Sequence, residues 1–354
     1  MNRPTEPVWA MLHEAGLVQG SAPEAKLEAP WYVKVLLAFS GWLAAVFLLV
    51  SIGMGLRFVF ENTAAATILG GLMIGGAFAV LRGPRNEFLE HLALAISLAG
   101  QALVVFAIVQ YFDGNETVIW ALLALLQVPL ALVMPNFVHR VFSSFLAALA
   151  FAMAFSSSGW PQLAGGVILF LAAWCWLDEF RHPAWMGRLR AFGYGLVLAL
   201  ILLKGTALFG YGLTGWSARS RPAVQVGPWL GEVLIGLVVL YVVRLLLQRY
   251  GSTWPDRIAV AALSGTLLLC AVALKVQGLS VGMVLILLGF AGSNRVLQGL
   301  GILSLLFYIS SYYYLLHATL LAKSLHLLGV GLVLLVLRRL MGKLLPAAME
   351  AGHV

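Results

Sequence analysis

Long apolar runs recur along almost the whole chain and limit the folds that it can adopt. The sequence is 62% apolar and only 10% charged over 354 residues, whereas soluble domains are about 45–50% apolar and about 25% charged. No water-soluble globule could bury so many runs. In a bilayer, backbone hydrogen bonds must be made within helices or closed barrels, and runs of about 20 apolar residues fit helices. The sequence therefore predicts an all-α, polytopic membrane helix bundle with short loops.

About twelve transmembrane helices are expected. They are predicted at residues 32–56, 63–81, 91–111, 117–134, 139–155, 162–178, 191–213, 228–248, 257–274, 279–292, 296–314 and 319–338. This gives a cytoplasmic N-terminal arm over residues 1–30, a transmembrane helical domain over 31–340 and a cytoplasmic tail over 341–354. The tenth span is short enough to be re-entrant. Where the break between 296 and 338 falls stays open, because no Gly or Pro marks the junction at 315–318.

The N-terminal arm contains a candidate short amphipathic helix. Val8, Trp9, Leu12 and Ala15 fall on one side of it, and Gly16 follows. Such a helix could lie on the membrane or on the protein's own cytoplasmic face. Docking of a partner is the alternative.

The net charge of +8 follows membrane topology and forms no face of its own. With the N-terminus inside, sixteen of the 22 Lys and Arg residues fall in inner segments, five fall in outer segments, and Lys204 lies within a span. Because cytoplasmic loops are enriched in Lys and Arg, this bias predicts that both termini are cytoplasmic. The predicted surroundings are the lipid bilayer, with no nucleic-acid partner.

Small residues predict close helix packing in the second span. Gly71 and Gly75 form a GxxxG pair, a pattern that lets helix backbones approach each other. We expect this pair to pack inside the protein, with a dimer face as the alternative.

Ionisable residues inside a span are candidates for function because their burial in lipid is costly. The acids lie in the arm, the tail, the loops or the span ends, with Glu232 about one turn into its span. Lys204 lies deeper. It could extend to the outer surface or pair with a loop acid such as Asp113 or Glu116, and an anion or substrate contact is the alternative.

A second group of candidates lies near the C-terminus. Tyr308, Tyr312, Thr319, Lys323 and His326 follow helical spacing and would form a polar stripe on a continuous helix. If the helix breaks near residue 317, they would face one another across a hairpin. The tyrosines could belong to an interfacial aromatic belt or to a buried polar cluster that orders the hairpin or contacts a ligand. With Lys204, these residues are the candidate functional polar cluster.

No catalytic, cofactor or metal site is predicted. The histidines supply no two ligands on one helix face at mid-membrane depth. The chain also lacks HExxH, P-loop, GxGxxG-after-strand and GxSxG patterns. Cys175 and Cys270 are far apart and have no CxxC spacing.

Several motifs together resemble a bacterial integral membrane family, domain of unknown function 4401. They are Leu12-His-Glu-Ala-Gly-Leu17, Pro30-Trp31 leading into 39–49, Gly289-Phe290 with Gly292-Ser-Asn-Arg295, and Tyr312-Tyr-Tyr-Leu315 with Thr319-Leu-Leu-Ala-Lys-Ser324. The resemblance implies a bacterial inner-membrane location and no assigned activity. It also implies partners, because such proteins tend to be encoded beside another polytopic protein and a smaller membrane protein with a GDYxxLxY motif.

Three functions are compatible with these features. The first is a non-catalytic subunit of a membrane protein complex, which fits the short loops and the lack of catalytic motifs. The second is a permease for a small or amphiphilic solute, which fits the span count and the embedded lysines. The third is a membrane enzyme acting on lipid-linked substrates, which would need polar groups converging at one depth.

Overall fold

Apolar helices joined by short polar turns make up the described structure. The computed structural model describes residues 61–83, 87–208, 229–251, 256–274 and 278–315, with scattered positions before and after them. Within these ranges it contains no strand. The helices are α4 (Thr63–Leu81), α5 (Glu87–Tyr111), α6 (Glu116–Val133), α7 (Phe137–Ser157), α8 (Pro161–Asp178), α9 (Met186–Leu208), α10 (Trp229–Arg249), α11 (Arg257–Ala273), α12 (Leu279–Ala291) and α13 (Arg295–Leu315), with short 3₁₀ turns at Glu179–Arg181 and Pro183–Trp185.

Asparagine side chains begin four of these helices. Asn62, Asn115, Asn136 and Asn294 each accept hydrogen bonds from backbone N–H groups of the first turn that follows. These N–H groups have no partner within the helix, so a capping side chain satisfies them. Pro161 starts α8, where its missing N–H removes no helical bond. Local sequence therefore sets where these five helices, α4, α6, α7, α8 and α13, begin.

The helices of the described ranges correspond to ten of the twelve predicted spans. Eight are long and apolar enough to cross a membrane, whereas α11 and α12 are shorter apolar helices. The helical class is confirmed, and the count of about twelve spans is not. The predicted spans 32–56 and 319–338 lie outside the described residues apart from scattered positions. So do Val8, Trp9 and Leu12 of the predicted arm helix.

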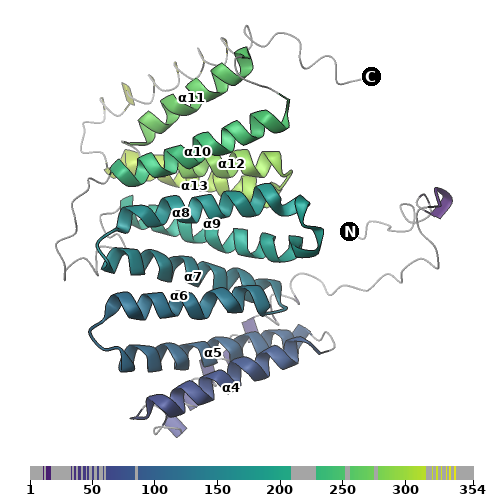
Figure 1. Ribbon diagram of the computed structural model, residues 1–354, viewed down its shortest axis with the longest axis vertical. Helices are drawn as coiled ribbons and strands as arrows, with labels where there is room; N and C mark the ends of the chain where they lie inside the picture. The colour runs from purple at the N-terminus through teal and green to yellow at the C-terminus, as the bar shows by residue number, and fades with distance from the viewer. Residues whose placement is uncertain are drawn as a thin grey trace.

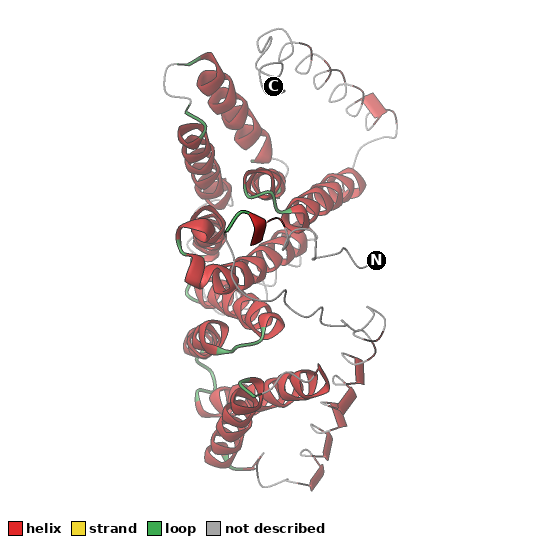
Figure 2. Ribbon diagram, turned by 90° about the vertical axis from the view of Figure 1, so that its right-hand side faces the viewer, coloured by secondary structure: helices red, strands yellow, loops and turns green. Residues whose placement is uncertain are grey.

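The described helices form an elongated row (Figure 1). Consecutive helices run in alternating directions, and the hairpins α4–α5, α6–α7, α8–α9 and α12–α13 each pack closely. Viewed from the side, the row is curved (Figure 2). The α12–α13 hairpin packs against α8, α9 and α10.

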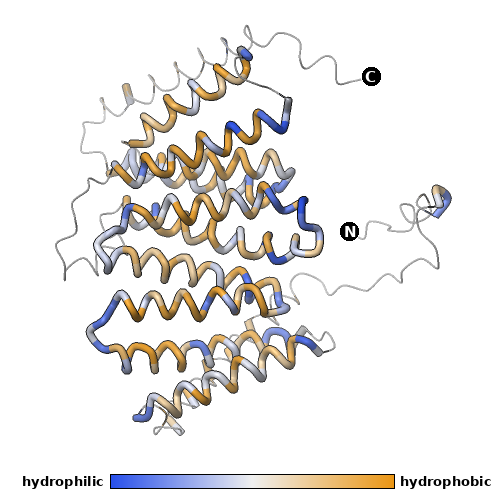
Figure 3. The backbone as a smooth tube through the Cα atoms, viewed as in Figure 1, coloured by the Kyte–Doolittle hydropathy of each residue, from blue (hydrophilic) through white to orange (hydrophobic). Residues whose placement is uncertain are grey.

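One side of the row, where one end of each described helix lies, carries most of the described arginines. The turns that lie there join α4 to α5, α6 to α7, α8 to α9, α10 to α11, and α12 to α13 (Figure 1). In or beside these turns are Arg82, Arg140, Arg181, Arg188, Arg190, Arg249 and Arg295. We call these helix ends the arginine-rich end. Hydrophobic residues dominate the middle of the helices, and polar residues gather at the helix ends (Figure 3).

Among the described residues, two separate clusters of buried apolar side chains are present. The larger one is built by α7, α8, α9, α10, α12 and α13, with Leu169, Leu200 and Leu285 fully buried. The smaller one joins Val59 to α4 and α5. Contacts between α5 and α6 are sparse, so little apolar packing connects the α4–α5 hairpin to the rest of the row.

Glycines allow the closest helix contacts, but not at the predicted pair. An added Cβ on Gly70 would lie 2.6 Å from the Gly100 carbonyl oxygen of α5. Gly71 and Gly75 meet no other described atom within 4 Å. Close packing of α4 within the described structure is internal, as expected. It uses Gly70 and not the Gly71–Gly75 pair.

Candidate functional site

Lys204 of α9 and Glu232 of α10 form an ion pair. The Lys204 Nζ lies 2.5 Å from the Glu232 Oε1. Their side chains are 15% and 3% exposed, respectively. Glu232 lies in the first turn of α10, where the partial positive charge of the helix N-terminus favours a carboxylate. An isolated charge in apolar surroundings is costly, and the ion pair gives each of these buried groups a partner of opposite charge.

The α12–α13 hairpin contributes two further polar side chains. The Ser280 hydroxyl donates a hydrogen bond of 3.4 Å to the Glu232 Oε2, so both carboxylate oxygens have a partner. The Tyr308 hydroxyl donates to the Ile201 carbonyl oxygen at 3.2 Å. The Tyr308 ring is fully buried and lies against Gly278, where an added Cβ would be 2.8 Å from the ring.

Together these contacts define a cluster with one side chain from each of four helices: Lys204, Glu232, Ser280 and Tyr308, called the lysine cluster below. Lys204 lies near the end of α9, and Glu232 and Ser280 lie at the starts of α10 and α12. The cluster is therefore on the opposite side of the row from the arginine-rich end. The arrangement neutralises a positive and a negative charge and connects four helices. Gly165 of α8 leaves room for the Lys204 stem, whose Cε would lie 3.9 Å from an added Cβ.

The lysine cluster brings together two of the six residues predicted as candidates, Lys204 and Tyr308. Tyr312, one turn further along α13, is half-buried. Thr319, Lys323 and His326 lie outside the described residues. The acid that pairs with Lys204 is Glu232, so the expectation of a loop acid such as Asp113 or Glu116 is wrong in the choice of acid.

Sequence reasoning missed Glu232 and Ser280 as parts of this site. Glu232 was placed near a span end, where a carboxylate ordinarily reaches water. In the structure α10 approaches α8 closely at the preceding residue, where an added Cβ on Gly231 would lie 3.2 Å from the Gln162 carbonyl oxygen, and Glu232 is buried.

A second buried polar cluster joins α5, α6 and α7. His139 Nε2 lies 2.8 Å from the Ser97 hydroxyl and 3.2 Å from the Gln101 Nε2. Gln127 donates to the Gln101 Oε1 at 2.9 Å, and the Ser143 hydroxyl lies 3.3 Å from the His139 Nδ1. All five side chains are buried. We call them the histidine cluster.

Both ring nitrogens of His139 have polar neighbours in the histidine cluster. Ser97 and Gln101 lie beside Nε2, and Ser143 lies beside Nδ1. A sequence signal for this cluster was available, because Ser97 and Gln101 are four residues apart, as are His139 and Ser143, and such pairs share a helix face.

A groove of about 430 Å³ lies between α8 and α10. Its apolar lining consists of Phe170, Trp174, Leu177, Tyr241 and Leu245, and its polar lining consists of Asp178, Arg181, Gln248 and Arg249. The polar residues lie at the arginine-rich end of both helices. The groove is therefore apolar toward the membrane interior and charged at its surface.

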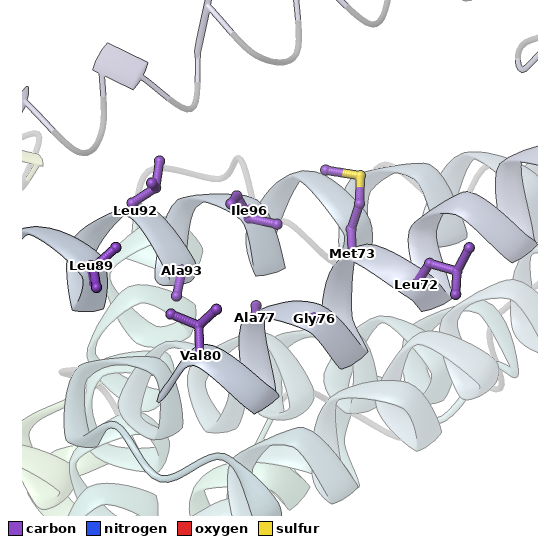
Figure 4. A pocket seen from close by; sticks show the side chains of 9 residues that line it. All are labelled: Leu72, Met73, Gly76, Ala77, Val80, Leu89, Leu92, Ala93 and Ile96. Atoms are coloured by element: carbon purple, nitrogen blue, oxygen red, sulfur yellow. The ribbon is translucent and has the colours of Figure 1, made fainter. Parts of the chain in front are cut away.

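A groove of about 390 Å³ lies between α4 and α5 and is lined only by apolar residues and a glycine. Figure 4 shows Leu89, Leu92 and Ile96 on α5 near Leu72, Met73 and Val80 on α4. With no polar lining residue, it has no group that could orient a solute. Neither groove is lined by a residue of the lysine or histidine cluster.

No described group of three or more His, Cys, Asp or Glu side chains is placed to hold a metal ion. Cys175 and Cys270 are both free thiols.

The long apolar helices of the described residues define a membrane-embedded helical protein. A family model described as domain of unknown function (DUF4401) matches residues 30–344. The chain belongs to this family, as its motifs indicated. No curated protein and no solved structure matches the chain significantly.

The segment Gly292-Ser-Asn-Arg295, one of those on which the resemblance was based, has a clear structural role. It forms the turn between α12 and α13, in which Ser293 has a positive φ of 50°. Asn294 then caps α13. The motif thus fixes the hairpin that contributes Ser280 and Tyr308 to the lysine cluster.

Proposed function

We propose that the protein is a non-catalytic subunit of a membrane protein complex in the bacterial inner membrane. The observation that carries this proposal is the internal pairing of the buried charges. Lys204 pairs with Glu232, and Arg190 binds the buried Glu179 at 2.5 Å. A group that binds a solute or reacts with one is ordinarily exposed to a cavity, whereas these groups bind one another.

The elongated shape of the described row also supports this role. Large apolar side chains are exposed along much of its length, among them Leu72, Leu125, Leu237 and Leu303. Lipid covers such side chains in any membrane protein, and a row of helices offers a larger lateral surface to protein partners than a closed bundle does. The enrichment of arginines at one end supports a cytoplasmic position for that end, and for both termini with it.

Purification from native membranes tests the subunit role. The chain would be tagged at its chromosomal locus, extracted in a mild detergent and compared with a tagged polytopic protein of similar abundance as a control. We expect one or a few membrane proteins to co-migrate with this chain at a fixed stoichiometry on native gels. A particle with the mass of a single 38.1 kDa chain and no co-migrating protein would contradict the proposal.

A permease is the second candidate, because Lys204 and Glu232 are ionisable side chains within the described helices. An ion pair near one membrane surface could open to admit a charged solute, since intramembrane ionisable residues commonly mark transport pathways. Under this alternative, the Lys204→Leu and Glu232→Gln variants would change the flux of a solute into proteoliposomes while Arg82→Gln would not. Equal flux in all of these proteins would remove the alternative.

A further inference from the structure

We infer that the groove between α8 and α10 binds an anionic phospholipid, with the phosphate at Arg181 and Arg249 and an acyl chain along Phe170, Trp174 and Tyr241. This site is independent of the proposed subunit role.

The length and direction of the groove match one leaflet of a bilayer. Phe170 and Asp178 on α8 are eight residues apart, as are Tyr241 and Arg249 on α10. At 1.5 Å per residue, each of these stretches covers about 12 Å along the helix axis. One leaflet of the hydrocarbon core is about 15 Å thick. The apolar part of the groove therefore reaches from the surface far toward the membrane centre.

Three aromatic residues line the apolar part. The Phe170 and Tyr241 rings are 6.0 Å apart between centroids and tilted by 40°. Phe170, Trp174 and Tyr241 are 44%, 49% and 47% exposed, so each packs on the protein with part of its surface and leaves the rest to the groove. Trp174 lies one turn from the helix end, at the depth where aromatic side chains are enriched in membrane proteins.

The charged part of the groove favours an anion. Two arginines and one aspartate among the lining residues leave an excess of one positive charge. Arg181 lies 3.3 Å from Asp178, but its side chain is 71% exposed, and such a surface pair contributes little. Arg249 donates to the Leu177 carbonyl oxygen at 2.5 Å. This bond uses one of its five N–H groups and holds the guanidinium at the end of α8.

The ligand chemistry follows from this division. Arginine binds phosphate groups through paired N–H groups, and in a phospholipid the covalently attached acyl chain covers the aromatic surface in the same molecule. Soluble phosphate would leave the aromatic part uncovered. A zwitterionic lipid would place its own cation beside two arginines.

Lipid titration of the full-length protein tests the site. The detergent-solubilised chain would be titrated with phosphatidylglycerol or phosphatidylcholine, and bound lipid would be counted by native mass spectrometry. We expect tighter binding of phosphatidylglycerol. Each of Arg181→Gln and Arg249→Gln should weaken this binding about five-fold, since one arginine near a membrane surface contributes about 1 kcal/mol toward an anionic lipid.

Three further measurements make the outcome specific. Arg82→Gln is the matched control, because Arg82 lies at the same end but on α4, against the Phe78 ring, and it should bind lipid as the wild type does. Trp174→Ala should weaken the binding of both lipids equally. Arg249→Lys should retain most of the preference, which separates loss of charge from loss of the bond to Leu177.

Three results would overturn the inference. One is equal affinity for the two lipids in the wild type. Another is the same loss in Arg82→Gln as in Arg181→Gln, which would indicate general surface charge. The third is full competition by glycerol phosphate at the concentration of the lipid, which would indicate a site for a soluble anion.

Discussion

The Tyr194 hydroxyl and the Asn294 side-chain amide exchange hydrogen bonds although the two residues are a hundred positions apart. Their O···O distance is 3.0 Å and their N···O distance is 2.9 Å. The Tyr194 ring also packs edge-on against Trp176, with 4.8 Å between centroids. This contact attaches the α12–α13 turn to α9, and so links the family's Gly-Ser-Asn motif to the large apolar cluster.

Removing the Tyr194 hydroxyl should have a smaller effect than removing the Asn294 side chain. Tyr194→Phe keeps the ring contacts and should lower the free energy of unfolding by about 1 kcal/mol. Asn294→Ala also loses the cap of α13 and should cost about 2 kcal/mol. Thermal unfolding in detergent would measure both. Equal losses would show that the cap contributes nothing.

Breaking the Lys204–Glu232 pair on one side should be worse than removing it entirely. Lys204→Met leaves a buried carboxylate without its cation and should destabilise the protein by about 3 kcal/mol. The double variant Lys204→Met/Glu232→Gln removes both charges and should recover much of that loss. A double-mutant cycle measured by thermal unfolding gives the coupling energy. If the losses of stability in the two single variants add up to the loss in the double variant, Lys204 and Glu232 do not stabilise the protein as a pair.

Adjacent glycines of α4 provide a matched test of helix packing. Gly70→Ala would place a methyl group 2.6 Å from a backbone oxygen of α5, so the helices must separate, at a cost of about 1–3 kcal/mol. Gly71→Ala meets no described atom within 4 Å and should be neutral or slightly stabilising because alanine favours the helix. Equal stability of the two variants would contradict the observed contact between Gly70 and Gly100.

The histidine cluster should hold the α4–α5 hairpin against α6 and α7. Gln101→Leu leaves the Gln127 amide without its buried acceptor and removes one of the polar contacts of His139, and it should cost about 1–3 kcal/mol. Hydrogen exchange should rise most in the α4–α5 hairpin, because little apolar packing connects it to the row. Gln110→Leu, at an exposed position of the same helix, is the control. Unchanged exchange in Gln101→Leu would contradict this role.

The sequence predicted the helices well because each depends on local features. For α6, the apolar run and the turn after it predict a helix over residues 117–134. The observed helix, Glu116–Val133, begins and ends one residue earlier. The prediction for α9 begins at 191, five residues after its observed start at Met186. The polar residues Arg188 and Arg190 in the first turns suggested a loop there, although α9 starts before them.

The partners of the polar side chains could not be predicted from the sequence. Lys204 and Glu232 are separated by 28 residues, and Tyr308 contacts a carbonyl group 107 residues away. Which helices become neighbours depends on the packing of the whole row, which apolar run length does not encode. For this reason the sequence suggested that Glu232 was an ordinary residue at a span end. It likewise gave no indication that the five members of the histidine cluster contact one another.

The histidine cluster, which joins α5 to α6 and α7, has a consequence for assembly of the protein. In lipid, no hydrophobic driving force holds apolar helix surfaces together, whereas hydrogen bonds between amide and imidazole groups form only in a narrow range of orientations. The chain is synthesised from its N-terminus, so α4 and α5 precede Gln127 of α6 and His139 of α7. We therefore expect the orientation of the α4–α5 hairpin to be fixed only after both of these residues have been added.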